Sequence, residues 1–168
     1  MDKKGNLWIG TDKGLKVVSK ETGNIITYKH DPNNIYSISD DNITSIIEDN
    51  YGILWIGTRS NGLNTFDRQT SKFFSYHRSE SDLSSLSADN VSYLFIDRAD
   101  ILWVGTYLGG VNKWDRTAVG IELYRKNPFD INSLSSNQIR CIFQDSHSIM
   151  WVGTVDNGLN KWDIANNK

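Results

Sequence analysis

Short segments in which apolar residues alternate with polar or small ones recur along the whole chain. One of them, Leu54–Thr58, reads Leu-Trp-Ile-Gly-Thr, and three other segments have nearly the same pattern. These are Leu7–Thr11, Leu102–Thr106 and Met150–Thr154. Their tryptophans, Trp8, Trp55, Trp103 and Trp151, are 47, 48 and 48 residues apart. A fixed period of this length is typical of proteins built from stacked repeats.

Each repeat contains short segments with the composition of β-strands, separated by turn residues. In the second repeat these segments are Ile43–Glu48, Leu54–Thr58, Leu63–Phe66 and Lys72–Tyr76. Alternation with a period of two residues, and almost no segment with a period of 3.6, indicates strands rather than helices. The pattern therefore predicts an all-β fold.

An aspartate opens the turn before each tryptophan segment. These aspartates are Asp2, Asp49, Asp97 and Asp145. Aspartate stabilises turns by bonding its own backbone, so we interpret the four as structural. A calcium loop is the alternative, but the alternating Asp/Asn ligands and terminal Glu of such loops are missing. We therefore expect no metal site, and we expect no cofactor.

The tryptophans and the hairpins that follow them have different expected roles. Each tryptophan is expected to pack between neighbouring sheets rather than to stack on a sugar. Every hairpin ends in a glycine that can supply a positive φ angle: Gly14, Gly62, Gly110 and Gly158. The residues before this glycine share no chemistry, so the hairpins are where the repeats differ.

A long polar connection follows the last strand of each of the first three repeats. It begins with the pairs Lys29-His30, His77-Arg78 and Arg125-Lys126. These pairs could bind acidic glycans, but we favour protection of the outer strand edges against aggregation. Further along, each connection contains a Ser-apolar-Ser sequence. Its apolar residue is expected to hold the connection against the core; these residues are Ile38, Leu86 and Leu134.

Repeats of about 48 residues with four antiparallel strands are typical of β-propeller blades. Counting the segments predicts fourteen strands, or three and a half blades, at approximately residues 2–29, 43–77, 91–126 and 139–163. The first set lacks the first strand and the last set lacks the fourth strand, so these two sets cannot combine into one blade. We predict that residues 1–168 form a single partial β-propeller, an open arc of a larger propeller.

Composition limits the possible partners. The 18 basic and 20 acidic residues give a net charge of −2, and 38% of residues are hydrophobic, as in a soluble globular protein. No basic field is present to attract nucleic acid, so no nucleic-acid partner is expected. The single cysteine, Cys141, excludes an internal disulfide.

No apolar run approaches the roughly 20 residues that span a bilayer, and the start at Met1 has no secretory signal. Because residue 2 already lies inside a repeat, Met1 is interpreted as a cut point and membrane contact as a property of a longer parent.

The repeats resemble the two-component regulator propeller repeat. Its pattern is an acidic turn, Gly, an apolar residue, Trp, Ile or Val, Gly-Thr, a short hairpin, Gly-Leu-Asn and an apolar-Asp ending. Residues 49–67 follow it throughout, and residues 145–163 differ only at Ser148. Residues 97–115 depart at Asp100 and Val111, and residues 2–19 depart most, at Lys16 and Ser19.

The resemblance implies a sensory function. Propellers of that family form the extracytoplasmic sensor of membrane-bound regulators, often hybrid histidine kinases that control polysaccharide use. The chain is thus expected to be a periplasmic ligand-sensing segment that binds a small molecule or an oligosaccharide, with the remaining blades of the parent propeller as partners. The 168 residues include no kinase, receiver or DNA-binding segment.

The expected ligand-binding residues lie on the variable hairpins. If the first strand of each repeat is innermost, these hairpins and the long connections emerge on one face, and such loops usually carry recognition. The candidates are Arg59, Tyr107, Asp156 and Asp12. The alternative is that they are solvated turn residues.

Three further expectations concern the class of protein. A propeller glycoside hydrolase or lyase is one alternative, but the aspartates repeat in equivalent turns and the histidines, His30, His77 and His147, form no acid–base group, so we expect no catalytic site. A protein-docking propeller scaffold is another alternative. Self-association through the uncovered end faces is also expected, with a face-to-face pair of arcs as one arrangement.

Overall fold

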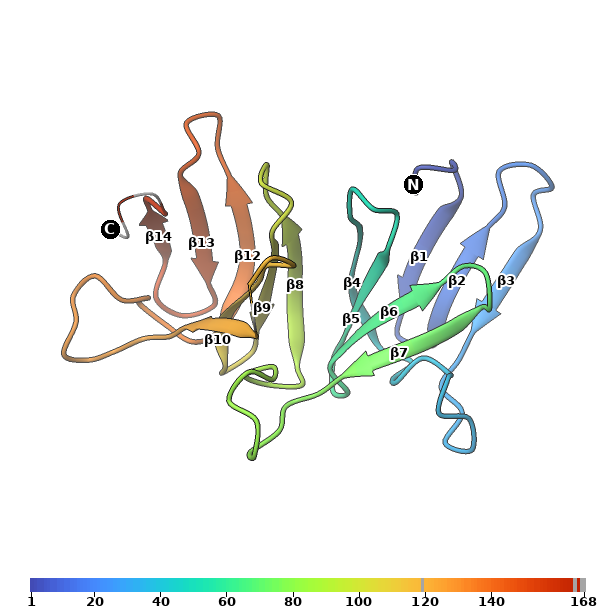
Figure 1. The fold of residues 1–168 in the computed structure, drawn as a ribbon, viewed down its shortest axis with the longest axis horizontal. Helices are drawn as coiled ribbons and strands as arrows, with labels where there is room; N and C mark the ends of the chain where they lie inside the picture. Colours follow the sequence, from blue (N-terminus) through green and yellow to red (C-terminus); the bar gives the residue numbers. More distant parts are fainter. Residues whose placement is uncertain (119, 165, 167–168) are drawn as a thin grey trace.

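The computed structural model describes residues 1–118, 120–164 and 166. Within this part of the chain all regular structure is β-strand, in four antiparallel sheets (Figure 1). None of the described residues belongs to a helix that could cross a membrane. The predicted all-β fold is therefore confirmed.

Strands follow one another within each sheet in chain order. The first sheet contains β1 (Leu7–Thr11), β2 (Gly14–Val18) and β3 (Ile25–Tyr28). The second contains β4 (Ile43–Glu48), β5 (Leu54–Thr58), β6 (Leu63–Asp67) and β7 (Lys72–Tyr76). The third contains β8 (Val91–Ile96), β9 (Leu102–Thr106), β10 (Gly110–Trp114) and β11 (Ile121–Tyr124). The fourth contains β12 (Ile139–Gln144), β13 (Met150–Thr154) and β14 (Leu159–Trp162).

The sheets are arranged like successive blades of a propeller. Strand β8 contacts both β4 and β12, and β1 contacts β4, so these strands lie along the inner side of the arc. The first and fourth sheets lie at opposite sides of the molecule, and the arrangement is open (Figure 1). This confirms the predicted partial propeller.

The connections divide between two ends of the sheets (Figure 1). We call the upper end in Figure 1 the turn end; it carries the aspartate turns 2–6, 49–53, 97–101 and 145–149. The opposite end, called the loop end, carries the variable hairpins and the long connections 29–42, 77–90 and 125–138. The backbone N–H of Gly62 donates to the carbonyl of Asp89 (2.8 Å), which joins a hairpin to a connection.

Each junction between sheets repeats the same packing. Trp55 and Leu63 pack with Leu102 and Val104 of the next sheet. In the following junction Trp103 and Val111 pack with the equivalent residues Met150 and Val152. Trp55 and Trp103 are buried, which confirms the interpretation of these two rings as packing between sheets.

The glycine of the tryptophan strand is required by the distance between sheets. A Cβ atom at Gly57 would lie 2.6 Å from a methyl group of Val91, and one at Gly105 would lie 2.7 Å from a methyl group of Ile139. Val91 and Ile139 begin the inner strands β8 and β12. A side chain at either glycine would therefore push neighbouring sheets apart.

Buried apolar residues hold the long connections, as predicted. Ile38, Leu86 and Leu134 are buried. A second anchor is the asparagine of β10: the Asn112 side-chain oxygen accepts a hydrogen bond from the backbone N–H of Ser87 (2.9 Å). Asn64 and Asn160 bond Ser39 and Ser135 in the same way (3.1 and 2.9 Å). The loop end is thus fixed to the sheets at regular points.

Trp103→Ala is expected to lower the free energy of unfolding by about 3 to 5 kcal/mol, because it empties the space between the third and fourth sheets. Urea unfolding of the variant and the parent chain measures the difference. Val155→Ala, at an exposed hairpin position, is the control and should change stability by less than about 0.5 kcal/mol. Equal effects at both positions would contradict the packing role of Trp103.

Candidate functional site

The four turn aspartates all bind the tryptophan of their own repeat. The second carboxylate oxygen accepts the indole N–H of the tryptophan six residues later. The distances are 2.8 Å for Asp2 and Trp8, 3.0 Å for Asp49 and Trp55, 2.8 Å for Asp97 and Trp103, and 2.8 Å for Asp145 and Trp151. This contact was not predicted from the sequence.

The first carboxylate oxygen orders the turn. In the second repeat, Asp49 Oδ1 accepts from the backbone N–H groups of Tyr51 (3.0 Å) and Ile53 (2.9 Å). The position three residues after each aspartate has positive φ: Gly5 84°, Gly52 82°, Asp100 62° and Ser148 64°. The predicted structural role of the aspartates is confirmed, and Asp100 and Ser148 occupy a conformation that favours glycine.

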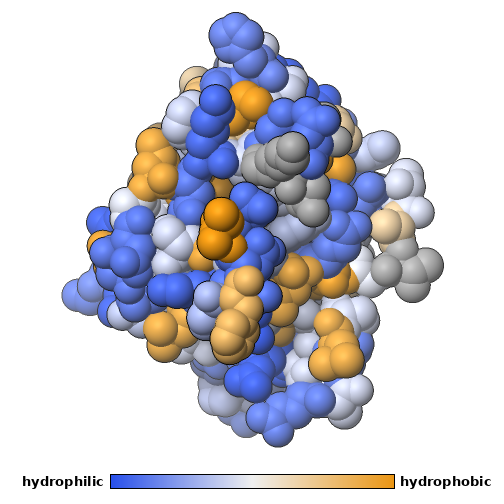
Figure 2. Space-filling model, turned by 90° about the vertical axis from the view of Figure 1, so that its left-hand side faces the viewer, coloured by the Kyte–Doolittle hydropathy of each residue, from blue (hydrophilic) through white to orange (hydrophobic). Residues whose placement is uncertain are grey.

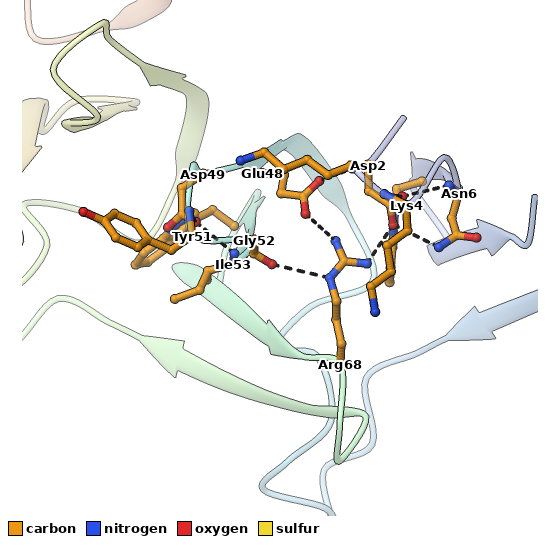
Figure 3. A network of polar contacts seen from close by, with 12 residues as sticks. Asp2, Lys4, Asn6, Glu48, Asp49, Tyr51, Gly52, Ile53 and Arg68 are labelled. Atoms are coloured by element: carbon orange, nitrogen blue, oxygen red, sulfur yellow. Dashed lines mark hydrogen bonds and ion pairs between the residues drawn. The ribbon is translucent and has the colours of Figure 1, made fainter.

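Two arginines each reach from one sheet to the turn aspartate of the preceding sheet, and Figure 3 shows the contacts of the first, Arg68. Arg68, in the turn after β6, donates to Asp2 Oδ2 (2.7 Å) and to Glu48 Oε1 (3.0 Å). Arg116, at the equivalent position of the third sheet, donates to Asp49 Oδ2 (2.6 Å). The aspartate turns therefore form a structural network rather than an open set of reactive carboxylates.

The network changes the acidity of its carboxyl groups. Burial opposes ionisation of Asp2, but hydrogen bonds from Trp8, Arg68 and Asn6 outweigh it and hold the pKa of Asp2 well below its usual range. The hydrogen bond from Trp151 similarly lowers the pKa of Asp145. Both groups are thus ionised near neutral pH and act as acceptors.

The predicted ligand-binding residues all lie exposed on hairpins at the loop end. The backbone N–H of Arg59 donates to the carbonyl of Asn42 (3.0 Å), and that of Tyr107 donates to the carbonyl of Asn90 (2.9 Å). Asn42 and Asn90 directly precede the inner strands β4 and β8. These backbone hydrogen bonds therefore hold both hairpin residues beside the start of an inner strand.

Asp156 and Asp12 complete the predicted set. The Asp156 carboxylate accepts from Gln138 Nε2 (3.3 Å), and Asp12 lies on the first hairpin. No hydrogen bond or ion pair joins any two of the four residues in the part of the chain that the structure describes. They share one end of the molecule without forming a single cluster, and their binding role stays a prediction.

A hollow of about 530 Å³ lies between β11, β14 and the connection 125–138. Its lining includes Tyr124, Arg125, Asn127, Asp130 and Trp162. The centroids of the Tyr124 and Trp162 rings are 4.4 Å apart. Burial and the Glu122 carboxylate, which accepts the Tyr124 hydroxyl at 2.8 Å, raise the pKa of Tyr124 to about 12. The hollow combines aromatic surface with amide, guanidinium and carboxylate groups.

A second hollow of about 490 Å³ lies toward the turn end. Half of its lining residues are aromatic, and they include Tyr51, Phe74, Tyr76 and Trp114. Among the described residues no group of three or more His, Cys, Asp or Glu side chains is placed to hold a metal ion. The available chemistry is therefore stacking, hydrogen bonding and charge.

Sequence reasoning missed the arginines and the first hollow because both depend on contacts between distant residues. Arg68 and Asp2 are 66 residues apart, and Tyr124 and Trp162 are 38 residues apart. A partial signal exists for the arginines: Lys20, Arg68 and Arg116 are spaced by 48 residues, each one or two residues after the end of β2, β6 or β10.

Comparison with known protein families finds the same repeat. The family model described as two component regulator propeller matches residues 37–60, 85–108 and 133–156. Each matched segment runs from the Ser-apolar-Ser sequence to the hairpin after the tryptophan strand. No curated protein matches the chain.

Solved structures with the same fold include extracellular domains of two component systems. The extracellular domain of the hybrid two component system BT4673 from B. thetaiotaomicron is similar with 27% identity and a TM-score of 0.81, over 99% of this chain and 23% of that one. The corresponding domain of BT3049 from B. thetaiotaomicron is similar with 22% identity and a TM-score of 0.78, over 99% and 22%. The chain thus spans less than a quarter of the length of these domains.

An enzyme shares the fold at lower similarity. A streptogramin B lyase structure has 14% identity and a TM-score of 0.62, over 96% of this chain and 52% of that one. Identity this low shows the fold alone, since propellers host unrelated functions.

Asp2→Asn is expected to remove a pH-dependent part of the stability. The pKa of Asp2 is lowered in the folded chain, so its contribution is present above the unfolded value of about 3.9 and is lost as pH falls below it. The stability difference between the parent chain and Asp2→Asn should therefore shrink from about pH 5 to about pH 2.

Urea unfolding at a series of pH values measures this difference. The control is Asp12→Asn, which changes an exposed hairpin carboxylate and should follow the parent curve. A constant offset for Asp2→Asn across the acid range would contradict the role given to the ionised carboxylate.

Proposed function

We propose that this chain, three repeats of which match the two-component regulator propeller model, is a ligand-sensing segment of an extracytoplasmic sensor domain in a two-component signal-transduction regulator. The match of three repeats to that family model carries the proposal. The likeness to extracellular domains of hybrid two component systems supports it. The parent chain would supply the membrane anchor and the effector.

The division between the two ends of the molecule supports a sensory role. The turn end repeats the aspartate–tryptophan contact in all four sheets and adds an arginine contact at two junctions, which makes a regular base. The loop end carries side chains that differ from hairpin to hairpin, such as Arg59, Tyr107 and Asp156. Variable loops on a rigid scaffold are the usual site of recognition.

We propose an oligosaccharide as the ligand. Sugars are bound by aromatic faces together with side chains that donate and accept hydrogen bonds, and the loop end offers Tyr107 with Arg59 and Asp156. The hollow beside Tyr124 and Trp162 offers a second surface of the same chemistry. The proposed location is the periplasm, where such a ligand would be met.

An enzymatic role has less support. Both oxygens of Asp49 are occupied by backbone and indole N–H groups. The imidazole Nδ1 of His30 lies 2.9 Å from the carbonyl of Ile38. These groups are held in structural contacts, which leaves no pair of free acid and base among them. We therefore propose that this segment binds without catalysing a reaction.

Arg59→Ala and Tyr107→Ala are each expected to weaken oligosaccharide binding by about tenfold, as for the loss of one hydrogen bond to a charged group or one stacked ring. Calorimetric titration of the 168-residue chain with the glycans that score in a panel measures the change. Arg98→Ala and Tyr51→Ala, exposed at the turn end, are the matched controls. A panel without any bound glycan would contradict the proposed ligand, and equal losses for all four variants would contradict its location.

Incubation of the parent ectodomain with the same glycans is expected to give no cleavage products. The four turn carboxylates accept hydrogen bonds from the indole N–H groups of their own repeats, so they are held in structural contacts and are not free to act on a substrate. Chromatography of the reaction mixtures is the measurement. Product formation that a single Asp→Asn substitution abolishes would favour a hydrolase or lyase instead.

A further inference from the structure

The hairpin that joins β9 to β10 carries an aromatic and an aliphatic residue in succession at its tip. Tyr107 is 42% and Leu108 is 61% exposed. At the positions 48 residues before and after Leu108, the second hairpin has Ser60 and the fourth has Asp156. The third sheet has a neighbouring sheet on each side, since β8 contacts both β4 and β12. This apolar tip therefore lies in the middle of the arc, away from its two end sheets.

Leu108 has a backbone conformation that leucine rarely adopts. Its φ angle is 72°, in the left-handed region, where the Cβ atom of an L-residue lies too close to the following carbonyl oxygen. Among the described residues, the other non-glycine residues with positive φ are polar: Ser71, Asp100 and Ser148. Leu108 is thus an apolar side chain at a position that favours glycine or asparagine.

Packing within the chain does not account for this leucine. Its side chain lies mostly in solvent, so it contributes little buried area to stability. Exposure alone would not mark a site, because single exposed apolar residues are common on protein surfaces. On the side where β14 lies, for example, apolar residues are separated by hydrophilic ones (Figure 2). Leu108 differs because it combines exposure with a conformational cost, and such a combination is typical of functional positions.

The hairpin is held firmly beneath these two side chains. Besides the backbone hydrogen bond of Tyr107 described above, the backbone N–H of Gly110 donates to the carbonyl of Asn137 (3.0 Å). The Nε of Arg125 donates to the carbonyl of Gly109 (3.1 Å). The tip is therefore ordered before a ligand arrives, so binding there loses little conformational freedom.

A second difference makes the surroundings of this tip less polar. In the second repeat the Asp40 carboxylate accepts the backbone N–H of Ser60 (3.0 Å). The residue 48 positions after Asp40 is Ala88. A Cβ atom at Gly109 would lie 2.9 Å from the Ala88 methyl group. The carboxylate that lies beside the second hairpin is thus replaced by a methyl group beside the third.

We propose that Tyr107 and Leu108 form an apolar subsite that binds the C–H face of a pyranose unit. The Tyr107 ring stacks on the sugar ring, and Leu108 contacts the C–H groups at its edge. The subsite rests on the proposed oligosaccharide ligand and identifies the hairpin that anchors it. The hairpins of Arg59 and Asp156 then bind hydroxyl groups, and the third hairpin contributes the removal of apolar surface from water.

Two substitutions of Leu108 separate ligand contact from folding. Asparagine tolerates the left-handed conformation but is polar. Leu108→Asn is therefore expected to weaken binding at least about tenfold, as for the loss of one buried leucine contact, and to leave the urea midpoint unchanged or raise it. Leu108→Met keeps an apolar side chain and should bind within about threefold of the parent chain.

Calorimetric titration measures binding, and urea unfolding of the same samples measures stability. The probes are soluble oligosaccharides of glucose, xylose, galactose, mannose and arabinose units, and the one that the parent chain binds most tightly is titrated into each variant. The control is Leu83→Asn, on the second long connection, where the side chain is 95% exposed. This variant should bind like the parent chain.

The possible failures can be told apart. A parent chain that binds none of these oligosaccharides would overturn the proposed function and the subsite together. Binding that Tyr107→Ala weakens but Leu108→Asn leaves unchanged would refute the subsite alone. A lower urea midpoint for Leu108→Asn would also refute it, because the leucine would then serve the fold.

Discussion

The hydrogen bond from the tryptophan indole to the turn aspartate is the contact on which the rest of the structure depends. A large ring between two sheets buries an N–H group, and a buried donor without a partner costs about 1 to 3 kcal/mol. The aspartate six residues earlier satisfies this donor with one oxygen and orders its own turn with the other. One carboxylate therefore sets the turn and the orientation of the ring, and the ring in turn sets where the next sheet packs.

This arrangement separates the two ends of each sheet. Structural contacts are concentrated at the turn end, where the aspartates, tryptophans and arginines lie. At the loop end, the connections are held by the buried residues Ile38, Leu86 and Leu134 and by the asparagines of the third strands. The hairpin side chains take no part in these contacts apart from the weak bond at Asp156. Their chemistry can therefore change between repeats without loss of the fold.

Most of the fold could be predicted from the sequence, because its signals are local and occur in four copies. Alternation at Leu54–Thr58, the glycine after each hairpin and the buried residue of Ser-apolar-Ser each depend on a few neighbouring residues. The candidate site was less predictable. The Asp49 to Trp55 bond needs the geometry of a turn, and the meeting of Tyr124 with Trp162 needs the placement of two sheets. The variable hairpins were predicted to share one end with the long connections, and this could be predicted because strand order alone decides it.

The junctions also show why the repeats tolerate change. Ile164 takes the place that Arg68 and Arg116 have at the other junctions, and apolar side chains often replace a partly buried ion pair with little net loss of stability. The arginine adds a fixed register between the two sheets, since the Arg68 guanidinium can reach Asp2, Glu48 and the Gly52 carbonyl in only one register. At the third junction the backbone N–H of Arg98 donates to Gln144 Oε1 (3.2 Å) and fixes the register from the inner strand. Different side chains thus give the same spacing between neighbouring sheets. The hairpins at the loop end are therefore held at regular positions although the contacts at the turn end differ between junctions.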